Sequence, residues 1–394
     1  MGRRFAVEML VMSKLPSAHF WNGRRVFLTG HTGFKGGWMA LWLKQLGATV
    51  CGYALEPEVQ PSLFQSLRLS EWMDSRIGDI RDLPKMQSVL TAFDPSIVIH
   101  MAAQPLVRDS YADPVKTYST NVMGTTHVLE IARTNPCIAG AVIVTSDKCY
   151  ENLEQAAPYR EGDRLGGRDP YSSSKACAEM IVSAYWWSYF RALDGQALAS
   201  VRGGNVIGGG DWSKDRLVPD LIAAFAQSRT AVIRHPESVR PWQHVLELVR
   251  GYLLAAEYIC GASATESPQA WNFGPEIADT VSVAVLASKV AAAWGGRAEF
   301  GIRRKDNAPH EATLLTLDHS KARSELGWRP VWSLDDAIQA TVAWNKAFYD
   351  GCDMLSFSQR QLANYIDPHA ADRTSGQSAA RPAPTKISMT ATGT

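Results

Sequence analysis

Cysteine is scarce in this sequence, and no two cysteines form a motif. The six cysteines among 394 residues show no CxxC pair and no histidine at zinc-site spacing. This scarcity argues against a disulfide framework or a metal site, and reduced thiols are the simpler interpretation. Long apolar runs are also missing, since none approaches the ~20 residues that span a bilayer.

The sequence also lacks an excess of one charge. Lys and Arg total 40 against 39 Asp and Glu, which gives a net charge of +1. This balance predicts neither a nucleic-acid surface nor a membrane surface. The basic start MGRRFAVEMLVMSKLPSAHF is interrupted by Glu8 and Lys14, and no small-residue cleavage site follows it. We therefore expect a flexible extension over residues 1–23, no signal peptide, and a cytoplasmic protein.

The sequence does contain a regular alternation of apolar strands and periodic helices. Hydrophobic residues make up 46% of the chain, enough for a large core. RVFLT at 25–29 and the run at 48–55 flank a helical segment, as in a βαβ unit. The pattern continues with a helix near 82–93, a strand at 96–102, a helix near 114–134, a strand ending at 144, a helix from 171 and a strand at 197–208. It predicts an α/β fold, a Rossmann-type doubly wound parallel sheet over residues 24–208.

The alternation weakens after residue 208. Strand-like pieces at 231–235 and 271–273 mix with helices at 242–259 and 281–295. We expect a smaller substrate-binding lobe over residues 209–350, interleaved with late pieces of the sheet. From 367 to 394 the chain has almost no large apolar residues, which predicts a disordered tail.

A glycine-rich turn follows the first strand. TGHTGFKG at 29–36 places Gly30, Gly33 and Gly36 at three-residue spacing between a strand and a helix. Glycines permit a tight turn and close approach of backbone amides to a pyrophosphate, and the helix N-terminus adds a partial positive charge. At the opening of a βαβ unit, dinucleotide binding is favoured over a structural turn.

An acidic residue usually holds the adenosine ribose about 20 positions after such a turn. Glu56 is near that place, and Asp79, after a later strand end, is better placed to meet the adenine. A helix cap is an equal alternative for Asp79. The second strand is not followed by a basic cluster, which favours NAD over NADP.

YSSSK at 171–175 places a phenol and an ammonium four residues apart, on one face of a helix. A tyrosine of pKa ~10 is a base at neutral pH only if about 4 kcal/mol of stabilisation lowers its pKa to ~7. The adjacent Lys175 and a positively charged nicotinamide ring together are expected to supply it. The alternative is an ordinary exposed pair at i,i+4 spacing with no catalytic role. The catalytic interpretation is favoured because Ser146 is available to hydrogen-bond the substrate hydroxyl on which Tyr171 would act.

These motifs resemble those of the extended short-chain dehydrogenase/reductases. TGxxGxxG, HMAAQ at 100–104, Asn121, TSD at 145–147, and Tyr171 with Lys175 follow in that family's order. The resemblance runs from about 24 to about 345 and includes LGWRP at 326–330. Within the family the chain most resembles the nucleotide-sugar 4,6-dehydratases. GFKGGW at 33–38, TSDKCYEN at 145–152 and RPWQHV at 240–245 look like the branch that acts on CDP-glucose.

The resemblance implies a lyase that turns CDP-D-glucose into CDP-4-dehydro-6-deoxy-D-glucose and water. Tyr171, with Lys175 and Ser146, would take the 4-hydroxyl proton while NAD+ accepts hydride from carbon 4. Asp147 would protonate the departing 6-hydroxyl, and the hydride would return to carbon 6. Lys148 stands where the dTDP-glucose enzymes carry glutamate. It acts either as a neutral base for the carbon-5 proton or as a charged stabiliser of the enolate, and we expect a shared role.

The resemblance also implies the residues that surround the two ligands. Those expected around the cofactor are Gly30, Thr32, Gly33, Phe34, Lys35, Gly36, Asp79, Ile80, Ala102, Ala103, Gln104, Asn121, Thr145, Tyr171 and Lys175. Those expected around the substrate are Gln104, Arg108, Asn205, Arg216 and Arg240, because an arginine fork suits phosphate. Arg202 is an equal choice between a place near the sugar diphosphate and an ion pair with a surface carboxylate. His310 and Glu311 border the nucleotide or are structural, and Trp212 is a candidate for the cleft wall.

Three other functions remain as alternatives, and one of them is a 4,6-dehydratase that acts on another nucleotide sugar. A nucleotide-sugar 4-epimerase would share everything except Asp147 and Lys148, and a non-catalytic NAD-binding sensor would have little need of Tyr171 and Lys175. The family further implies a homodimer through the helices near 114–134 and 170–190, whose apolar stretches include VLEIA and ACAEMIV. Deoxysugars for surface polysaccharide are the usual products of such enzymes.

Overall fold

The computed structural model of the chain describes residues 13–155, 157–261, 267–303 and 314–368. The predictions for residues 1–12, for His310 and Glu311, and for 369–394 fall outside the described residues. Within them, no helix has both the length and the apolar character needed to cross a bilayer. All six cysteines carry free thiols.

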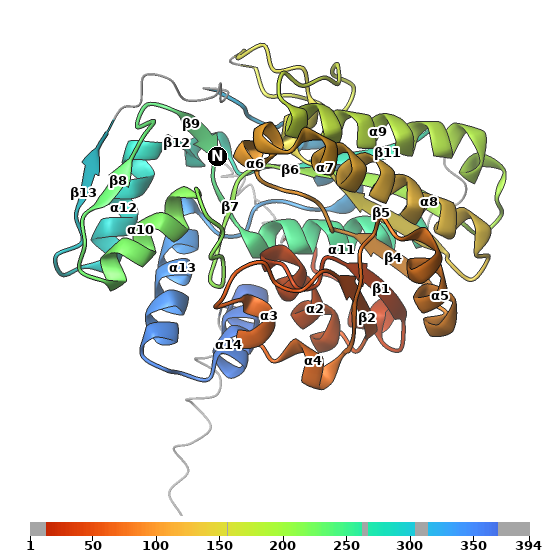
Figure 1. The fold of residues 1–394 in the computed structure, drawn as a ribbon, viewed down its shortest axis with the longest axis horizontal. Coiled ribbons are helices and arrows are strands. Elements are labelled where there is room, and N and C mark those ends of the chain that lie inside the picture. Colours follow the sequence, from red (N-terminus) through yellow and green to blue (C-terminus); the bar gives the residue numbers. More distant parts are fainter. Residues whose placement is uncertain (1–12, 156, 262–266, 304–313, 369–394) are drawn as a thin grey trace, which may run out of the picture.

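A parallel sheet of seven strands forms the centre of the molecule (Figure 1). In chain order its strands are β1 (Arg25–Thr29), β2 (Thr49–Ala54), β3 (Asp74–Ile77), β4 (Ile97–His100), β5 (Gly140–Val144), β6 (Ala197–Gly203) and β11 (Gln269–Phe273). Their order across the sheet is β11-β6-β5-β4-β1-β2-β3, with every neighbouring pair parallel. The order reverses direction between β1 and β4, which confirms the predicted doubly wound sheet.

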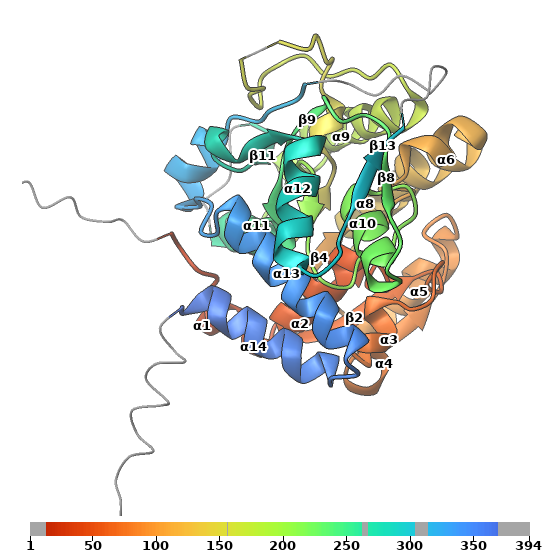
Figure 2. The same ribbon diagram turned by 90° about the vertical axis from the view of Figure 1, so that its left-hand side faces the viewer.

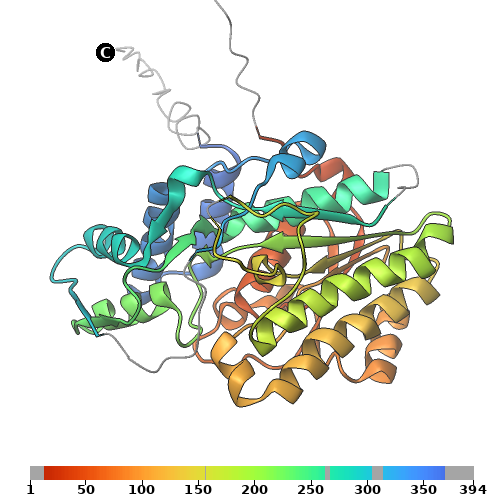
Figure 3. The same ribbon diagram turned by 90° about the horizontal axis from the view of Figure 1, so that it is seen from above.

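Helices cover both faces of this sheet because its strands are apolar on both sides (Figure 3). In β1, Val26 and Leu28 enter one hydrophobic cluster and Phe27 enters the other. One face is covered by α2 (Phe34–Gln45) and α11 (Val245–Gly261), and the other by α5 (Leu83–Phe93), α8 (Gly124–Thr134) and α9 (Pro170–Ser188). The carboxyl ends of the strands are left open for a ligand.

A second, smaller region lies beside the sheet (Figure 2). Its strand pairs are β8 (Ala231–Ile233) with β13 (Phe300–Ile302), and β9 (Val239–Pro241) with β12 (Thr280–Ser282). Its helices are α10 (Leu217–Ala226), α12 (Val283–Trp294) and α13 (Leu334–Tyr349), which share their own hydrophobic cluster. Because β11 and α11 follow residue 208 yet join the main sheet, the two regions are interleaved along the chain.

Two predicted elements are interrupted in the structure. The helix predicted near 114–134 consists of α7 (Pro114–Tyr118), a π-helical segment over Ser119–Met123, and α8. The strand predicted at 197–208 ends at Gly203, and β7 (Val206–Ile207) pairs separately with β10 (Gln243–His244). Glycine weakens a strand interior, and Gly203 and Gly204 coincide with this break.

The remaining elements are α1 (Ala18–Trp21), α3 (Leu63–Ser66), α4 (Leu69–Trp72), α6 (Val107–Ala112), α14 (Met354–Ile366), three 3-10 turns (Asp147–Cys149, Phe190–Ala192, Ile277–Asp279) and a π turn (Ala322–Leu326).

Residues 13–23 differ from the flexible extension expected there. Trp21 is fully buried, and its indole Nε1 donates to Glu257 over 2.8 Å. Ser13 accepts a hydrogen bond from Arg250 over 2.6 Å and donates to the carbonyl of Arg329 over 3.0 Å. Burial of a tryptophan and these buried polar partners hold the segment on α11.

The apolar stretch VLEIA, named above for a helix of the expected homodimer, packs inside the molecule. Val128, Leu129, Ile131 and Ala132 are all buried in the cluster beneath the sheet. The exposed apolar side chains of this side of the molecule come instead from α7 and α9, where Val115, Met180 and Trp187 are 77%, 53% and 52% exposed.

Candidate active site

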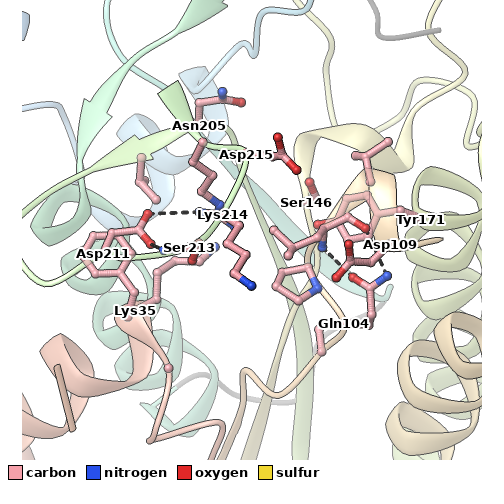
Figure 4. A pocket seen from close by; sticks show the side chains of 18 of the residues that line it. Lys35, Gln104, Asp109, Ser146, Tyr171, Asn205, Asp211, Ser213, Lys214 and Asp215 are labelled. Carbon is pink, nitrogen blue, oxygen red and sulfur yellow. Dashed lines mark hydrogen bonds and ion pairs between the residues drawn. The ribbon is translucent and has the colours of Figure 1, made fainter. Parts of the chain in front are cut away.

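A cleft of about 950 Å³ lies at the carboxyl ends of the parallel strands and extends to the smaller region (Figure 4). Ligands of doubly wound sheets bind at this edge, where the strand order reverses. Every residue predicted to bind cofactor or substrate, or to take part in chemistry, lines the cleft except Asn121. Residues as far apart in the sequence as Gly30 and Arg240 are therefore brought together here.

The glycine turn is too tight for other residues at two positions. Gly30 has φ +81°, and a Cβ there would lie 2.7 Å from the amide nitrogen of Ala102. A Cβ on Gly36 would lie 2.1 Å from the carbonyl oxygen of Gly30. Gly33 donates to that same carbonyl over 3.1 Å and precedes the first residue of α2. The turn thus places backbone amides beside the N-terminus of α2, and this arrangement fits the binding of a pyrophosphate.

A buried Thr–His pair holds the strand end beside this turn, and sequence reasoning missed it. Thr29 Oγ1 accepts from the amides of Met101 and Ala102 over 3.1 Å and lies 2.7 Å from His100 Nδ1. Burial, and then the charge of Lys175, lowers the pKa of His100 to about 3. His100 is therefore neutral, and it serves to position the backbone of Ala102 at the cleft wall.

Asn121 lies behind the cleft wall. Its amide nitrogen donates to Gln104 O over 3.0 Å and to Ser174 Oγ over 2.9 Å, while its oxygen accepts from Gln104 N over 2.8 Å. Gln104 itself lines the cleft and bonds to Thr117 Oγ1 over 3.0 Å. Asn121 thus supports Gln104 from behind the cleft wall, and its predicted contact with the cofactor stays a prediction.

The polar cluster after β5 forms a short 3-10 turn with its own hydrogen bonds. Ser146 Oγ donates to Asp147 Oδ1 over 2.9 Å and accepts from the amide of Lys148 over 3.2 Å. Lys148 Nζ lies 3.7 Å from Asp147 Oδ1, and the two side chains are 29% and 2% exposed. The carboxylate is thus buried while the ammonium reaches into the cleft.

Tyr171 and Lys175 lie in the first turns of α9, which Asp169 caps by accepting from the amide of Ser172 over 2.9 Å. Burial raises the pKa of Tyr171 to about 12, although its hydrogen bond with Ser146 acts in the opposite direction. Burial thus outweighs the hydrogen bond at Tyr171 here, and the lowering of its pKa by Lys175 and a bound nicotinamide ring together stays a prediction. Figure 4 shows Tyr171 and Ser146 on the same side of the cleft.

Two lysines in the cleft have depressed pKa values. Burial lowers the pKa of Lys175 to about 8, and the Glu179 carboxylate partly offsets this. Lys175 Nζ donates to the carbonyl of Val144 over 3.3 Å. Burial, followed by the charges of Arg216 and Lys175, lowers the pKa of Lys35 to about 7. Lys35 and Lys175 both line the cleft, and an anionic ligand there would favour their charged forms.

Arg202 is not on the surface, as one alternative had it, but pairs with a buried carboxylate behind the cleft. Its guanidinium lies 2.7 Å from Glu179, and the two side chains are 5% and 3% exposed. Glu179 also accepts from Ser200 over 2.7 Å and from Thr145. Arg202 donates further to Tyr150 over 2.8 Å. Sequence reasoning missed Glu179, whose only local signal is its position one turn after Lys175.

The acidic residues near the second and third strands take different positions. Glu56 lines the cleft just after β2. Asp79 also lines it, but its carboxylate is paired with Arg81 over 2.5 Å, which lowers its pKa. The helix cap suggested for Asp79 is wrong, because Asp82 caps α5 by accepting from Lys85 N over 3.1 Å.

The segments after β6 contribute two arginines and an asparagine to the cleft: Asn205, Arg216 and Arg240. Arg240 is only 9% exposed and donates to the carbonyl of Val239 over 2.9 Å. Arg216 lies 3.5 Å from the carboxylate of Asp211. Trp212 lines the cleft with its ring 5.0 Å from that of Phe348. Asn205 completes this wall in Figure 4.

Comparisons with known proteins agree with this architecture. The model of the family described as GDP-mannose 4,6 dehydratase matches residues 27–341. Over 354 residues the chain is 50% identical to the CDP-glucose 4,6-dehydratase of Salmonella typhimurium, covering 88% of this chain and 98% of that relative. It is 30% identical over 270 residues to the dTDP-glucose 4,6-dehydratase of Streptomyces griseus, covering 68% of this chain and 76% of that relative.

Solved structures show the same fold at lower identity. A dTDP-glucose 4,6-dehydratase from Bacillus anthracis in complex with NAD superposes with a TM-score of 0.69 at 20% identity, covering 84% of this chain and 100% of that one. A UDP-glucose 4-epimerase from Brucella ovis, also with NAD, gives a TM-score of 0.70 at 24% identity over 82% and 98% of the two chains. The family match and the 50% identical relative each span most of the chain. The chain therefore belongs to the GDP-mannose 4,6 dehydratase family of extended short-chain dehydrogenase/reductases.

Proposed function

We propose that the chain is an NAD-dependent hydro-lyase that converts CDP-D-glucose into CDP-4-dehydro-6-deoxy-D-glucose and water. The observation that carries this proposal is the Asp147–Lys148 pair, 3.7 Å apart, beside Ser146 and Tyr171 in one cleft. A 4-epimerase needs the tyrosine and the serine but has no step that removes a hydroxyl. The additional pair therefore favours elimination, in agreement with the 50% identity to a CDP-glucose 4,6-dehydratase.

Tyr171 is the base for the 4-hydroxyl of the sugar. Its phenol oxygen takes the proton while Ser146, already bonded to it, orients the same hydroxyl. The charged form of Lys175, one helical turn away, stabilises the phenolate. When bound, NAD+ supplies the two-electron acceptor for carbon 4 and the donor for carbon 6, and its positive charge favours the phenolate further.

Elimination of water follows because a ketone at carbon 4 acidifies the proton at carbon 5. Asp147 is the acid that protonates the departing 6-hydroxyl, and its burial keeps it out of bulk water. Lys148 takes the carbon-5 proton when neutral and stabilises the enolate when charged. The two side chains, 3.7 Å apart, divide the proton transfers: Asp147 supplies the proton that leaves with the 6-hydroxyl as water, and Lys148 returns a proton to carbon 5 when the hydride adds to carbon 6.

The residues present fit an NAD cofactor. The turn at Gly30, Gly33 and Gly36 offers backbone amides and a helix N-terminus to the pyrophosphate. Glu56 and Glu58 line the cleft after β2. Their carboxylates accept from ribose hydroxyls and repel the extra phosphate of NADP, which supports NAD.

Arg240, Arg216 and Asn205 are the proposed ligands of the sugar diphosphate. All three line the cleft, where planar guanidinium forks pair with phosphate oxygens. The cytosine preference rests on the identity to the Salmonella typhimurium enzyme. A destination in surface-polysaccharide deoxysugars remains part of this proposal.

The test is incubation of the purified protein with CDP-glucose and catalytic NAD+, followed by the alkaline absorbance of a 4-keto-6-deoxy sugar. We expect this chromophore with CDP-glucose and little with the dTDP-, UDP- and GDP-glucoses. Tyr171→Phe should lower the rate by roughly 10²–10⁴-fold. A product that keeps its 6-hydroxyl and is inverted at carbon 4 would instead identify an epimerase. Binding of NAD without turnover of any of these sugars would identify a sensor.

We further propose a homodimer that forms through α7 and α9. Val115, Met180 and Trp187 are exposed apolar side chains on these two helices, which pack against each other. Large apolar side chains exposed on two packed helices are typical of an interface. Sedimentation of Met180→Glu/Trp187→Glu should give a monomer where the unchanged chain gives a dimer.

The six free thiols support a reducing, cytoplasmic location.

A further inference from the structure

Three charged side chains from separate segments meet at the wall of the cleft. Arg108 lies on α6, Asp215 in the loop before α10, and Arg234 directly after β8. The carboxylate of Asp215 lies 3.0 Å from Arg108 Nη1 and 2.6 Å from Arg234 Nη2. All three residues line the cleft, so one carboxylate bridges two arginines where a ligand would lie.

This bridge connects the two sides of the cleft. On one side, Ser110 of α6 accepts a hydrogen bond from the amide of Tyr171 over 3.2 Å, so Arg108 belongs to the catalytic side. On the other side, Arg234 also lies 3.6 Å from Asp220 of α10, within the smaller region. Figure 4 shows Asp215 projecting from its loop between these two sides. A ligand that fills the cleft must therefore meet this bridge.

The bridge is exchangeable because it is accessible to water. The side chains of Asp215, Arg108 and Arg234 are 45%, 30% and 25% exposed. Ion pairs this accessible to water contribute little to stability, so a better anion displaces them easily.

We propose that Asp215 is an internal anion that occupies Arg108 and Arg234 in the free protein and gives way to the phosphates of the substrate. This inference rests on the proposed function, because a nucleotide sugar carries a diphosphate. A diphosphate has two charges and several oxygens, and each guanidinium fork pairs with two of them. A carboxylate has one charge for both arginines. Arg234 thereby becomes a substrate ligand in addition to Arg240, and substrate takes over the connection between the two sides of the cleft.

The test is the affinity of Asp215→Asn for nucleoside diphosphates, measured by titration calorimetry with CDP, UDP, dTDP and GDP. Asparagine keeps the size of the side chain and removes its charge. Because two exposed ion pairs no longer compete, we expect the preferred nucleotide to bind roughly two- to tenfold more tightly than to the unchanged chain. The gain should be larger at low salt, where the competing ion pairs are stronger. Unchanged or weaker binding would overturn the proposal, because Asp215 would then be a bystander or itself a ligand.

Three further variants make the result specific. Arg234→Gln should weaken binding, and in the Arg234→Gln/Asp215→Asn double variant most of the gain should disappear, as a double-mutant cycle would show. Asp74→Asn is the matched control, since Asp74 pairs with Arg76 over 2.6 Å, is 38% exposed and does not line this cleft. It changes the net charge equally and should leave affinity unchanged. The readout is the binding of any of four nucleotides and does not depend on turnover. If the protein fails to dehydrate CDP-glucose, the proposed function is overturned, but the affinities of the variants still test the role of Asp215.

Discussion

The carboxylate of Glu179 lies 2.7 Å from the guanidinium of Arg202 in a site where neither side chain exceeds 5% exposure. This pair connects the middle of α9 with β6, directly behind the strand end that carries Ser146. Glu179 also accepts from Thr145, the first residue after β5. The catalytic helix and the polar strand end are therefore held together by one buried carboxylate.

We predict that Glu179→Gln lowers the free energy of unfolding by about 3 kcal/mol, because it leaves the buried charge of Arg202 without its partner. Burial alone would raise the pKa of Glu179, but the charge and hydrogen bonds of Arg202 lower it overall. A carboxyl whose folded-state pKa is depressed stabilises the protein above its unfolded pKa. The difference from the variant should therefore shrink as the pH falls below the ordinary value of 4.5.

Glu130→Gln is the matched control for this measurement. Glu130 pairs with Arg133 on α8, but the two side chains are 34% and 31% exposed. Exposed pairs contribute at most about 1 kcal/mol. Denaturant unfolding of both variants at pH 7 compares them directly. Equal losses would mean that the buried pair is not an anchor of the site.

A second prediction concerns the alkaline limb of the pH profile. Burial lowers the pKa of Lys175 to about 8, so Lys175 loses its charge, and with it the stabilisation of the Tyr171 phenolate, as the pH rises through that value. We expect kcat/KM at saturating NAD+ to fall above about pH 8. Lys175→Arg should move this limb to higher pH, because a guanidinium keeps its charge.

Glu179 provides the check on this assignment. Its charge raises the pKa of Lys175, so Glu179→Gln should move the limb to lower pH. A merely structural role for Glu179 would lower activity equally at every pH. If the alkaline limb stays at the same pH in Lys175→Arg and in Glu179→Gln, then a group other than Lys175 causes it.

The sequence predicted those parts of the site whose geometry is set within one turn or one helix. Gly30 and Gly36 are separated by six positions, and the strand-turn-helix around them follows from that local pattern. Tyr171 and Lys175 share a helix face by spacing alone. Glu179 and Arg202 lie on different elements, and the pairing of two side chains across a fold depends on tertiary packing. The same holds for Arg108, Asp215 and Arg234, which come from three segments.

A third prediction tests the glycine turn. In Gly36→Ala the new Cβ would lie 2.1 Å from the carbonyl oxygen of Gly30, which is backbone and cannot rotate away. We expect a loss of roughly 1–3 kcal/mol in stability, as for other overpacked sites, and weaker binding of NAD+ in calorimetry. Gly37→Ala is the control, because its Cβ would meet Leu63 Cδ2 at 2.7 Å, the movable end of a side chain. Equal effects of both substitutions would show that helix packing, and not the turn, determines binding.

The last prediction separates the two roles of Lys148. Lys148→Met keeps the length of the side chain and removes both its proton-accepting nitrogen and its charge. With CDP-glucose in deuterated buffer, the unchanged chain should incorporate deuterium at carbon 5, and the variant should lose this exchange if Lys148 is the base. Lys148→Arg keeps the charge but is not a base, so it should restore exchange only if Lys148 acts by stabilising the enolate. Exchange that is unchanged in the methionine variant would exclude Lys148 from the step and leave Asp147, 3.7 Å away, as the group nearest to take the proton.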